Sequence, residues 1–218
     1  MLVTFSGLDG AGKTTLIDGL RNALEGSGRP VRVLTMYDHV GVYALLRRVR
    51  ALIRRWTRFG AQQAGVVRGD RDASTSVWLC LFRNRLVKQS TYPIDLAMFL
   101  LCRLYQEVVR RRVLILDRYF YDSIVDVAEG ARDRPSRALA RWVPTPDLPI
   151  YVEASPEIAF ARKREYSVDR LHVRQQLYHQ LFAGVDRVLV VRNQDGAPVR
   201  AVEAIASRVV GGWSRWSR

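Results

Sequence analysis

Short apolar runs along the chain alternate with stretches whose apolar residues recur every three or four positions. The runs predict buried strands, and the helical spacing predicts helices that pack by one face. Five strands are expected, at residues 2–6, 31–35, 113–117, 148–153 and 187–191. Helices are expected at residues 14–24, 156–164, 169–182 and 199–210. Strands that alternate with helices indicate an α/β fold, with a parallel sheet covered by helices on both faces.

The segment from about 41 to 107 breaks this alternation, and we interpret it as helices that leave and rejoin the sheet. Residues 42–59 form its most basic part, where apolar residues at three- and four-residue steps are separated by arginines. A helix packed by one face with its arginines in water explains this pattern. Contact with an anionic membrane surface or a large anionic acceptor is the alternative. Because no linker divides the chain, we expect one domain over residues 1–218.

The composition is that of an ordinary soluble globular protein, with 48% hydrophobic and 26% charged residues. No apolar run reaches the roughly 18 residues of a membrane-spanning helix, and no secretion signal is visible, so we expect a cytoplasmic protein. Cys80 and Cys102 lie in apolar surroundings and are expected to be reduced, buried thiols. The last eight residues, 211–218, are expected to be a disordered end or a surface contact.

The formal net charge of +14 is unusual and favours anionic partners: nucleotides, nucleic acid or an anionic membrane surface. A generic solvated surface rich in arginine is the alternative explanation. The three histidines, His39, His172 and His179, have no spacing that suits a metal cluster. His39 follows the second strand and could line a ligand pocket at that edge of the sheet.

The most specific motif is Gly-x-x-x-x-Gly-Lys-Thr at residues 7–14, between the first strand and the first helix. Such a loop turns backbone N–H groups inward around phosphate oxygens, and the helix N-terminus adds partial positive charge. We expect Lys13 to reach the β- and γ-phosphates of ATP and the Thr14 hydroxyl to bind Mg²⁺. The predicted phosphate-binding residues are Gly7, Asp9, Gly10, Ala11, Gly12, Lys13, Thr14 and Thr15.

An acid and an arginine follow the third strand, at Asp117 and Arg118. Ligands of open α/β sheets bind outside the carboxyl ends of the strands, so Asp117 is placed to hold Mg²⁺. Arg118 would face the same crevice and clamp a phosphate group with its planar guanidinium. An ordinary acid that caps a strand is the alternative for Asp117.

A basic segment at about 161–170 follows the fourth strand and a short helix. Phosphoryl transfer needs cations around the transferring group and exclusion of water, and a mobile basic lid supplies both. Arg162, Arg164 and Arg170 are therefore candidate catalytic cations. A solvated, charged loop is the alternative.

Taken together, these motifs resemble those of thymidylate kinase-type nucleoside monophosphate kinases, in order from residue 2 to about residue 210. The residues 5–15 are close to the phosphate loop of that family, including the acid at Asp9. Residues 96–106 resemble its helix with an Arg-x-x-Gln pair, here Arg103 and Gln106. Asp117-Arg118-Tyr119 resembles its Asp-Arg-aromatic motif, with Ser123 as the serine that follows. Residues 154–157 resemble the turn before its lid helix.

The resemblance implies a P-loop kinase fold, a three-layer sandwich around a five-stranded parallel sheet of order 2-3-1-4-5. It also implies ATP and Mg²⁺ as cofactors and a homodimer. Asp9 would lie near the sugar of the acceptor or the metal, Arg118 would hold the acceptor phosphate, and Arg103 would lie near the acceptor base or phosphate. The expected acceptor side comprises Asp9, Tyr37, Asp38, His39, Arg103, Gln106, Arg118, Tyr119 and Ser123.

Two segments depart from the family pattern and bear on the acceptor. The Arg-x-Pro-Gly-Gly-type segment after the second strand is replaced here by Tyr37-Asp38-His39, and the Ala-Tyr-Gln after the serine is replaced by residues 124–127. The leading hypothesis is an ATP- and Mg²⁺-dependent kinase of a nucleoside monophosphate or related anionic acceptor. A kinase of another metabolite, a sugar or a nucleic-acid hydroxyl is one alternative. A non-enzymatic P-loop nucleotide binder is the other.

Overall fold

The computed structural model describes residues 1–35, 85–129, 143–192 and 198–216. The chain forms two compact units, and each is described by itself: residues 1–36 with 103–218, and residues 37–102. In the second unit the described residues belong to α5 (Arg85–Leu104). The predictions for Tyr37, Asp38, His39, Cys80 and the basic helix at 42–59 lie outside the described residues. The single-domain organisation stays a prediction.

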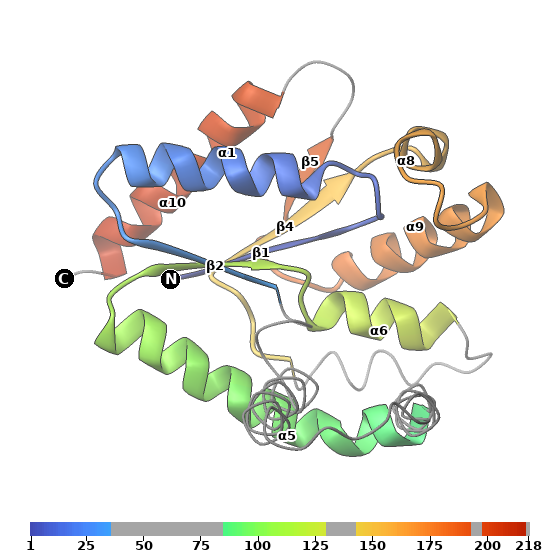
Figure 1. Ribbon diagram of the computed structural model, residues 1–218, viewed down its shortest axis with the longest axis horizontal. Helices are drawn as coiled ribbons and strands as arrows, with labels where there is room; N and C mark the ends of the chain where they lie inside the picture. Colours follow the sequence, from blue (N-terminus) through green and yellow to red (C-terminus); the bar gives the residue numbers. More distant parts are fainter. Residues whose placement is uncertain (36–84, 130–142, 193–197, 217–218) are drawn as a thin grey trace, which may run out of the picture. The chain divides into compact units, whose positions relative to one another are not determined.

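The first unit is built on a parallel sheet of five strands (Figure 1). The strands are β1 (Leu2–Gly7), β2 (Val31–Thr35), β3 (Val113–Asp117), β4 (Leu148–Glu153) and β5 (Leu189–Arg192). Their order is β2-β3-β1-β4-β5, which confirms the expected order and the α/β fold of a P-loop kinase. All pairs are parallel, so the carboxyl ends of the strands meet at one edge of the sheet.

The central strands β1 and β3 carry the core of the sheet. All six residues of β1 and the first four of β3 are buried, as continuous apolar runs in a sheet covered on both faces should be. Phe5 pairs with Asp117 in the register between them. This pairing places the loop after β1 beside the end of β3.

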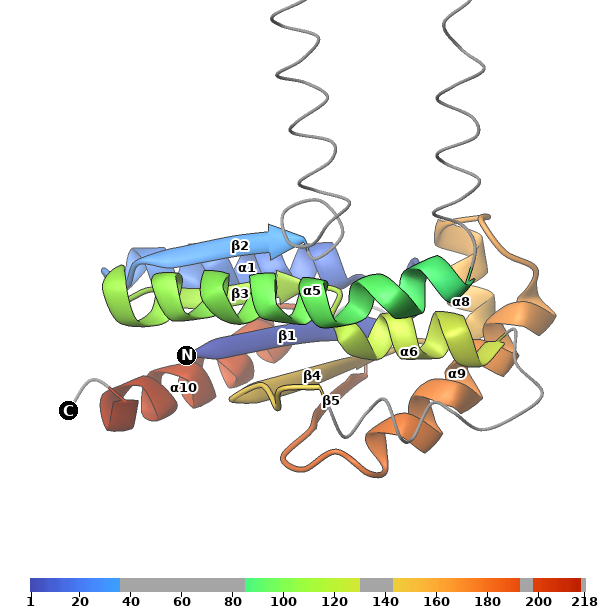
Figure 2. The same cartoon turned by 90° about the horizontal axis from the view of Figure 1, so that it is seen from below.

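Helices cover both faces of the sheet (Figure 1). On one face α1 (Lys13–Gly26) packs against α10 (Pro198–Trp216), where a Cβ added at Gly19 would lie 2.7 Å from Val202. On the other face lie α6 (Phe120–Glu129) and α9 (Val168–Phe182), and α8 (Pro156–Arg162) links β4 to α9. The chain enters β3 from a π-helical turn, η1 (Tyr105–Val109), which follows α5. Figure 2 shows α6, α8 and α9 at the carboxyl ends of β1 and β4.

Three boundaries differ from the sequence-based expectation. Strand β5 begins at Leu189 and not at Arg187, because Arg187 has a left-handed φ of 60° that extended backbone does not allow. Helix α8 ends at Arg162, since Lys163 is already extended. Helix α10 continues to Trp216, so the expectation of a disordered end from residue 211 is wrong up to that residue. Gly212 lets α10 approach the Met1 side chain, which lies 3.0 Å from a Cβ added there.

The described residues lack two features, a membrane-spanning helix and a cluster of metal-ligating side chains. Within residues 1–35, 85–129, 143–192 and 198–216, no helix is long and apolar enough to cross a lipid bilayer. The same part of the chain contains no group of three or more histidine, cysteine or acidic side chains that would hold a metal ion by themselves.

Candidate functional site

The loop between β1 and α1 depends on three glycines with positive φ. Gly7, Gly10 and Gly12 have φ values of 146°, 90° and 90°, which residues with a Cβ rarely adopt. A Cβ on Gly7 would lie 2.3 Å from the Val152 carbonyl oxygen, and one on Gly10 would lie 2.4 Å from that of Ala159. Gly12 is the N-cap residue of α1 and has no side chain to occupy the N–H groups of the first turn. The loop therefore keeps the form of a phosphate cradle at a helix N-terminus.

Replacing Gly10 by alanine is expected to disrupt this loop. The added methyl group would collide with the backbone of α8, and the residue would have to hold a left-handed φ. We expect Gly10→Ala to lower the melting temperature by about 4 °C or more and to abolish nucleotide binding. Gly26→Ala is the matched control. Gly26 ends α1, the helix that follows the loop, and nothing lies within 4 Å of a Cβ added there. Unchanged nucleotide affinity in Gly10→Ala would contradict the close approach of α8.

The Lys13 side chain folds back over the loop. Its Nζ donates hydrogen bonds to the carbonyl oxygens of Gly7 (2.7 Å) and Leu8 (2.8 Å) and lies 3.8 Å from Asp9 Oδ1. Only 7% of Lys13 is exposed. Burial lowers the pKa of Lys13, while the negative charges of Asp122 and Asp9 oppose this shift. The ammonium group is thus buried over the loop, against its backbone carbonyl oxygens.

Asp9 and Arg118 form an ion pair at the mouth of the loop, from Arg118 Nη2 to Asp9 Oδ1. The backbone makes this pair possible, because Arg118 has a left-handed φ of 64° and its N–H donates to the Phe5 carbonyl at 3.0 Å. A left-handed conformation at a non-glycine residue is uncommon, and such residues cluster at functional sites. The structure therefore brings the predicted Arg118 and Asp9 together.

Asp117 ends β3 beside this pair. Its Oδ1 atom is buried and makes no hydrogen bond. Burial raises the pKa of Asp117, while the nearby Lys13 and Arg118 cations lower it. A buried, unpaired carboxylate oxygen is costly unless a cation or donor completes it. Asp117 Oδ1 and the exposed hydroxyl of Thr14 are hard oxygen ligands, so the residues present fit Mg²⁺. Thr15 is also exposed in this first turn of α1.

Asp122 is a functional candidate that the motif analysis did not single out. It lies in the first turn of α6, between the predicted residues Tyr119 and Ser123 in the sequence. Its carboxylate is buried next to the phosphate loop and accepts three hydrogen bonds, from Ser6, Tyr178 and the Tyr119 backbone. In the sequence Asp122 is visible only as an acid five residues after Asp117. Whether such an acid faces the sheet or the solvent cannot be decided until the position of the helix is known.

The predicted lid residues are divided among different contacts. Arg170 pairs with Glu129 of α6 and lies over the Tyr166 ring, 4.3 Å from its centroid. Arg174, which the sequence did not suggest, is buried and pairs with Glu129 (2.7 Å) and Asp126 (2.8 Å). These contacts tie the start of α9 to the end of α6.

The other lid cations are exposed. Arg162 ends α8, and Arg164 lies in the turn that follows. Between them, the hydrogen bond from Lys163 to Glu165 raises the pKa of Lys163, and the negative charge of Asp9 adds to this effect. The charge of Asp9 therefore reaches Lys163, which lies between the predicted lid residues Arg162 and Arg164.

Arg103 and Gln106 lie at the other end of the sheet. Arg103 pairs with Glu107 (3.0 Å) and Asp147 (3.3 Å), and Glu107 in turn pairs with the Met1 amino group (3.2 Å). Met1 precedes β1, whereas the phosphate loop follows it, so about 20 Å of strand separates the two places. The structure does not bring Arg103 and Gln106 to the loop, and their predicted acceptor role gains no support from this placement.

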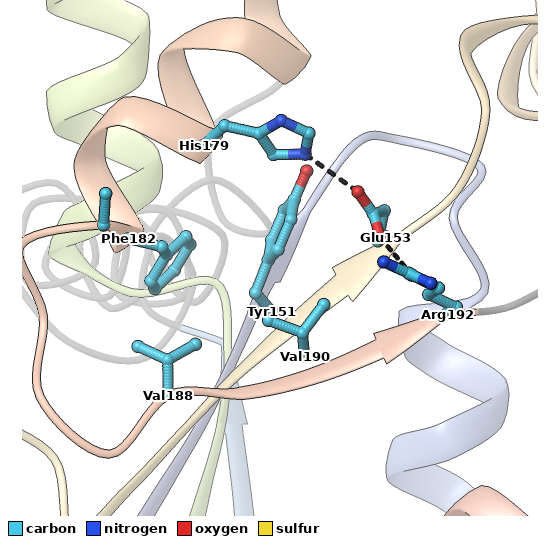
Figure 3. Close-up of a pocket in the computed structure, with 8 residues that line it drawn as sticks. Tyr151, Glu153, His179, Phe182, Val188, Val190 and Arg192 are labelled. Atoms are coloured by element: carbon cyan, nitrogen blue, oxygen red, sulfur yellow. Dashed lines mark hydrogen bonds and ion pairs between the residues drawn. The ribbon is translucent and has the colours of Figure 1, made fainter.

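A separate groove of about 680 Å³ lies along β4, β5 and α9 (Figure 3). Its floor is apolar, with Tyr151, Phe182, Val188 and Val190, and Ala183 also lines it. At its polar end Glu153 contacts His179 (2.9 Å) and Arg192 (3.0 Å). None of the predicted site residues lines this groove, so it is distinct from the phosphate loop.

Comparison with known proteins gives a distant match. Two thymidylate kinases of Bifidobacterium longum, from strains DJO10A and NCC 2705, are each 28% identical to the chain over 179 residues. The aligned region covers 78% of this chain and 74% of each kinase. No family model matches the chain. The chain is thus similar to thymidylate kinases over most of its length, at low identity.

Proposed function

We propose that the chain is an ATP- and Mg²⁺-dependent kinase that transfers the γ-phosphoryl group of ATP to a nucleoside monophosphate or related anionic acceptor. The observation that carries this proposal is the glycine-built loop with the buried Lys13 ammonium over it and the unpaired Asp117 Oδ1 beside it. The distant similarity to thymidylate kinases supports a nucleotide kinase. A structural loop alone would not need a buried cation next to an unsatisfied carboxylate.

The charges around Lys13 support a requirement for a divalent cation. Three carboxylates, Asp9, Asp117 and Asp122, face two cations, Lys13 and Arg118. This excess of negative charge would repel a polyphosphate, so a metal ion is needed to offset it. When bound, Mg²⁺ neutralises charge on the phosphate oxygens, and Asp117 and Thr14 are the residues that would hold it.

The residues of the chain act by position and charge. The loop N–H groups and the start of α1 bind phosphate oxygens, and Lys13 offsets the charge on the transferring group. Arg118 can leave Asp9 to hold the acceptor phosphate, since a planar guanidinium binds phosphate at two points. Lid cations, from among Arg162, Lys163, Arg164 and Arg170, exclude water and surround the reacting oxygens. Little covalent chemistry is required of the protein.

Exposed apolar side chains support a second copy of the chain as a partner. Leu104, Tyr105, Val108 and Val109 are exposed at the end of α5 and in η1. Clusters of this kind mark protein interaction surfaces. A homodimer therefore belongs to the proposal. Nucleic acid and an anionic membrane surface are further partners that the basic composition permits.

The acceptor is tested by a transfer screen of radiolabelled ATP and Mg²⁺ against nucleoside monophosphates, nucleosides and sugars. Because the segment after β2 departs from the family pattern, we expect thymidylate to be a poor substrate, with kcat/KM below about 10⁴ M⁻¹s⁻¹. We expect another anionic acceptor to be preferred. Thymidylate at or above that value and ahead of all other acceptors would make the chain a plain thymidylate kinase. Absence of transfer to every acceptor, with ATP still bound, would favour a non-enzymatic nucleotide binder.

A further inference from the structure

The Asp122 carboxylate is buried among neutral donors. Only 3% of the residue is exposed. Oδ2 accepts from the Ser6 hydroxyl (2.7 Å) and the Tyr119 N–H (2.9 Å), and Oδ1 accepts from the Tyr178 hydroxyl (2.7 Å). These donors satisfy the oxygen atoms but carry no charge. A buried carboxylate in such a shell still needs a cation nearby to offset its charge.

The Lys13 ammonium has the opposite need. It is buried, and its hydrogen-bond acceptors are the neutral carbonyl oxygens of Gly7 and Leu8. Asp9 is 3.8 Å away, but the Arg118 guanidinium already binds the Asp9 oxygen that faces Lys13. Burial lowers the pKa of Lys13, and the negative charge of the buried Asp122 is among those that oppose this shift.

The backbone of β1 connects the two groups. Ser6, which donates to Asp122, directly precedes Gly7, whose carbonyl accepts from Lys13. Tyr178 fixes the carboxylate from the other side, on α9, and its ring is held by stacking on Tyr151 and Phe182. The carboxylate is thus held rigidly behind the phosphate loop by β1, α6 and α9.

Resting on the proposed function, we propose that Asp122 is a positioning residue, the resident counter-charge that keeps the Lys13 ammonium over the phosphate loop before nucleotide binds. The phosphate groups of ATP take over this role when they arrive, since they bring negative charge to the same ammonium. Asp122 then repels them, and part of its stabilising effect in the empty protein is lost.

A double-mutant cycle on the nucleotide-free full chain tests the pairing. The variants are Asp122→Asn, Lys13→Met and their combination, and the measurement is thermal unfolding. Asp122→Asn removes one counter-charge from the buried ammonium, and Lys13→Met removes the cation that faces the buried carboxylate, whereas the double change removes both charges of the pair. We expect the double variant to melt at least about 3 °C above the sum of the two single effects. Additive effects would overturn the proposal.

Tyr121→Phe is the matched control for this cycle. It removes a buried hydroxyl from α6 that is not bonded to Asp122 and changes no charge, so its combination with Lys13→Met should be additive. If Asp122→Asn alone fails to fold, adding Lys13→Met should restore folding, and failure to restore it would overturn the pairing.

The melting-temperature rise caused by MgATP gives a second readout. It should be larger in Asp122→Asn than in the wild type, because a charge that repels phosphate is gone. An equal or smaller rise would mean that Asp122 is only a structural hydrogen-bond acceptor. A wild-type protein that MgATP does not stabilise would argue against the proposed function, and the cycle would still decide the role of Asp122.

Discussion

Lys13→Met is expected to reduce phosphoryl transfer from ATP at least about 100-fold while the chain stays folded. The magnitude follows from the loss of a positioned cation where charge develops in the transition state. Methionine preserves the apolar stem that fills the space over the loop, and Lys13 lies among backbone carbonyls and acids instead of core side chains. The measurement is steady-state transfer to the preferred acceptor, with circular dichroism to verify folding.

Arg21→Met is the matched control for this substitution. Arg21 lies on the same helix, but its side chain is partly exposed and pairs with the exposed Asp18 at 3.5 Å. Removing it changes the net charge by the same amount and should leave transfer unchanged. Lys13→Met activity within about tenfold of the wild type, a barrier change of about 1.4 kcal/mol, would remove Lys13 from the transfer step.

The strands were predictable because buried parallel strands consist of continuous apolar residues bounded by turn-forming or polar residues. Val31–Thr35, Val113–Asp117 and Leu148–Glu153 begin and end in the structure where the sequence indicates. The start of α8 was also predictable, since Pro156 fits the first turn and the Ser155 hydroxyl accepts from the Ile158 N–H at 3.3 Å. The order of the strands came from the resemblance to a family, because apolar runs do not say which strands are neighbours.

The candidate site was predictable only where a motif carries its own geometry. Gly7, Gly10 and Gly12 stand at the three positions where the backbone of the loop has a positive φ, so their spacing predicts the loop conformation. Arg103 shows the opposite case, because the spacing of an Arg-x-x-Gln pair on a helix does not say how far the pair lies from the loop. Through Glu107, Arg103 lies next to Met1 at the start of β1. About 20 Å of strand separates this place from the loop after β1.

Asp122 and Arg174 escaped prediction for a related reason. Each is a charged residue whose partner comes from a different part of the chain, Tyr178 for Asp122 and Asp126 for Arg174. Such pairs become visible only when the helices are placed. The pairing with Arg174 also gives a role to Asp126, one of the residues that depart from the family pattern.

Asp117→Asn is expected to raise the Mg²⁺ concentration for half-maximal transfer at least about tenfold, a free-energy change of about 1.4 kcal/mol. Asparagine keeps the shape of the side chain but removes the charge that a hard divalent cation requires. ATP binding without metal should be unchanged or tighter, because one of three carboxylates that repel phosphate is neutralised. The fold should tolerate the change, since burial already disfavours the charged form of Asp117 and raises its pKa.

Mg²⁺ titrations of transfer, together with calorimetric ATP binding in EDTA, separate the two effects. Asp186→Asn, at an exposed position before β5, is the control and should leave both unchanged. An unaltered Mg²⁺ titration in Asp117→Asn would mean that the orphaned Oδ1 is not a metal ligand, and the divalent-ion requirement would then have to rest on Thr14 and the nucleotide alone.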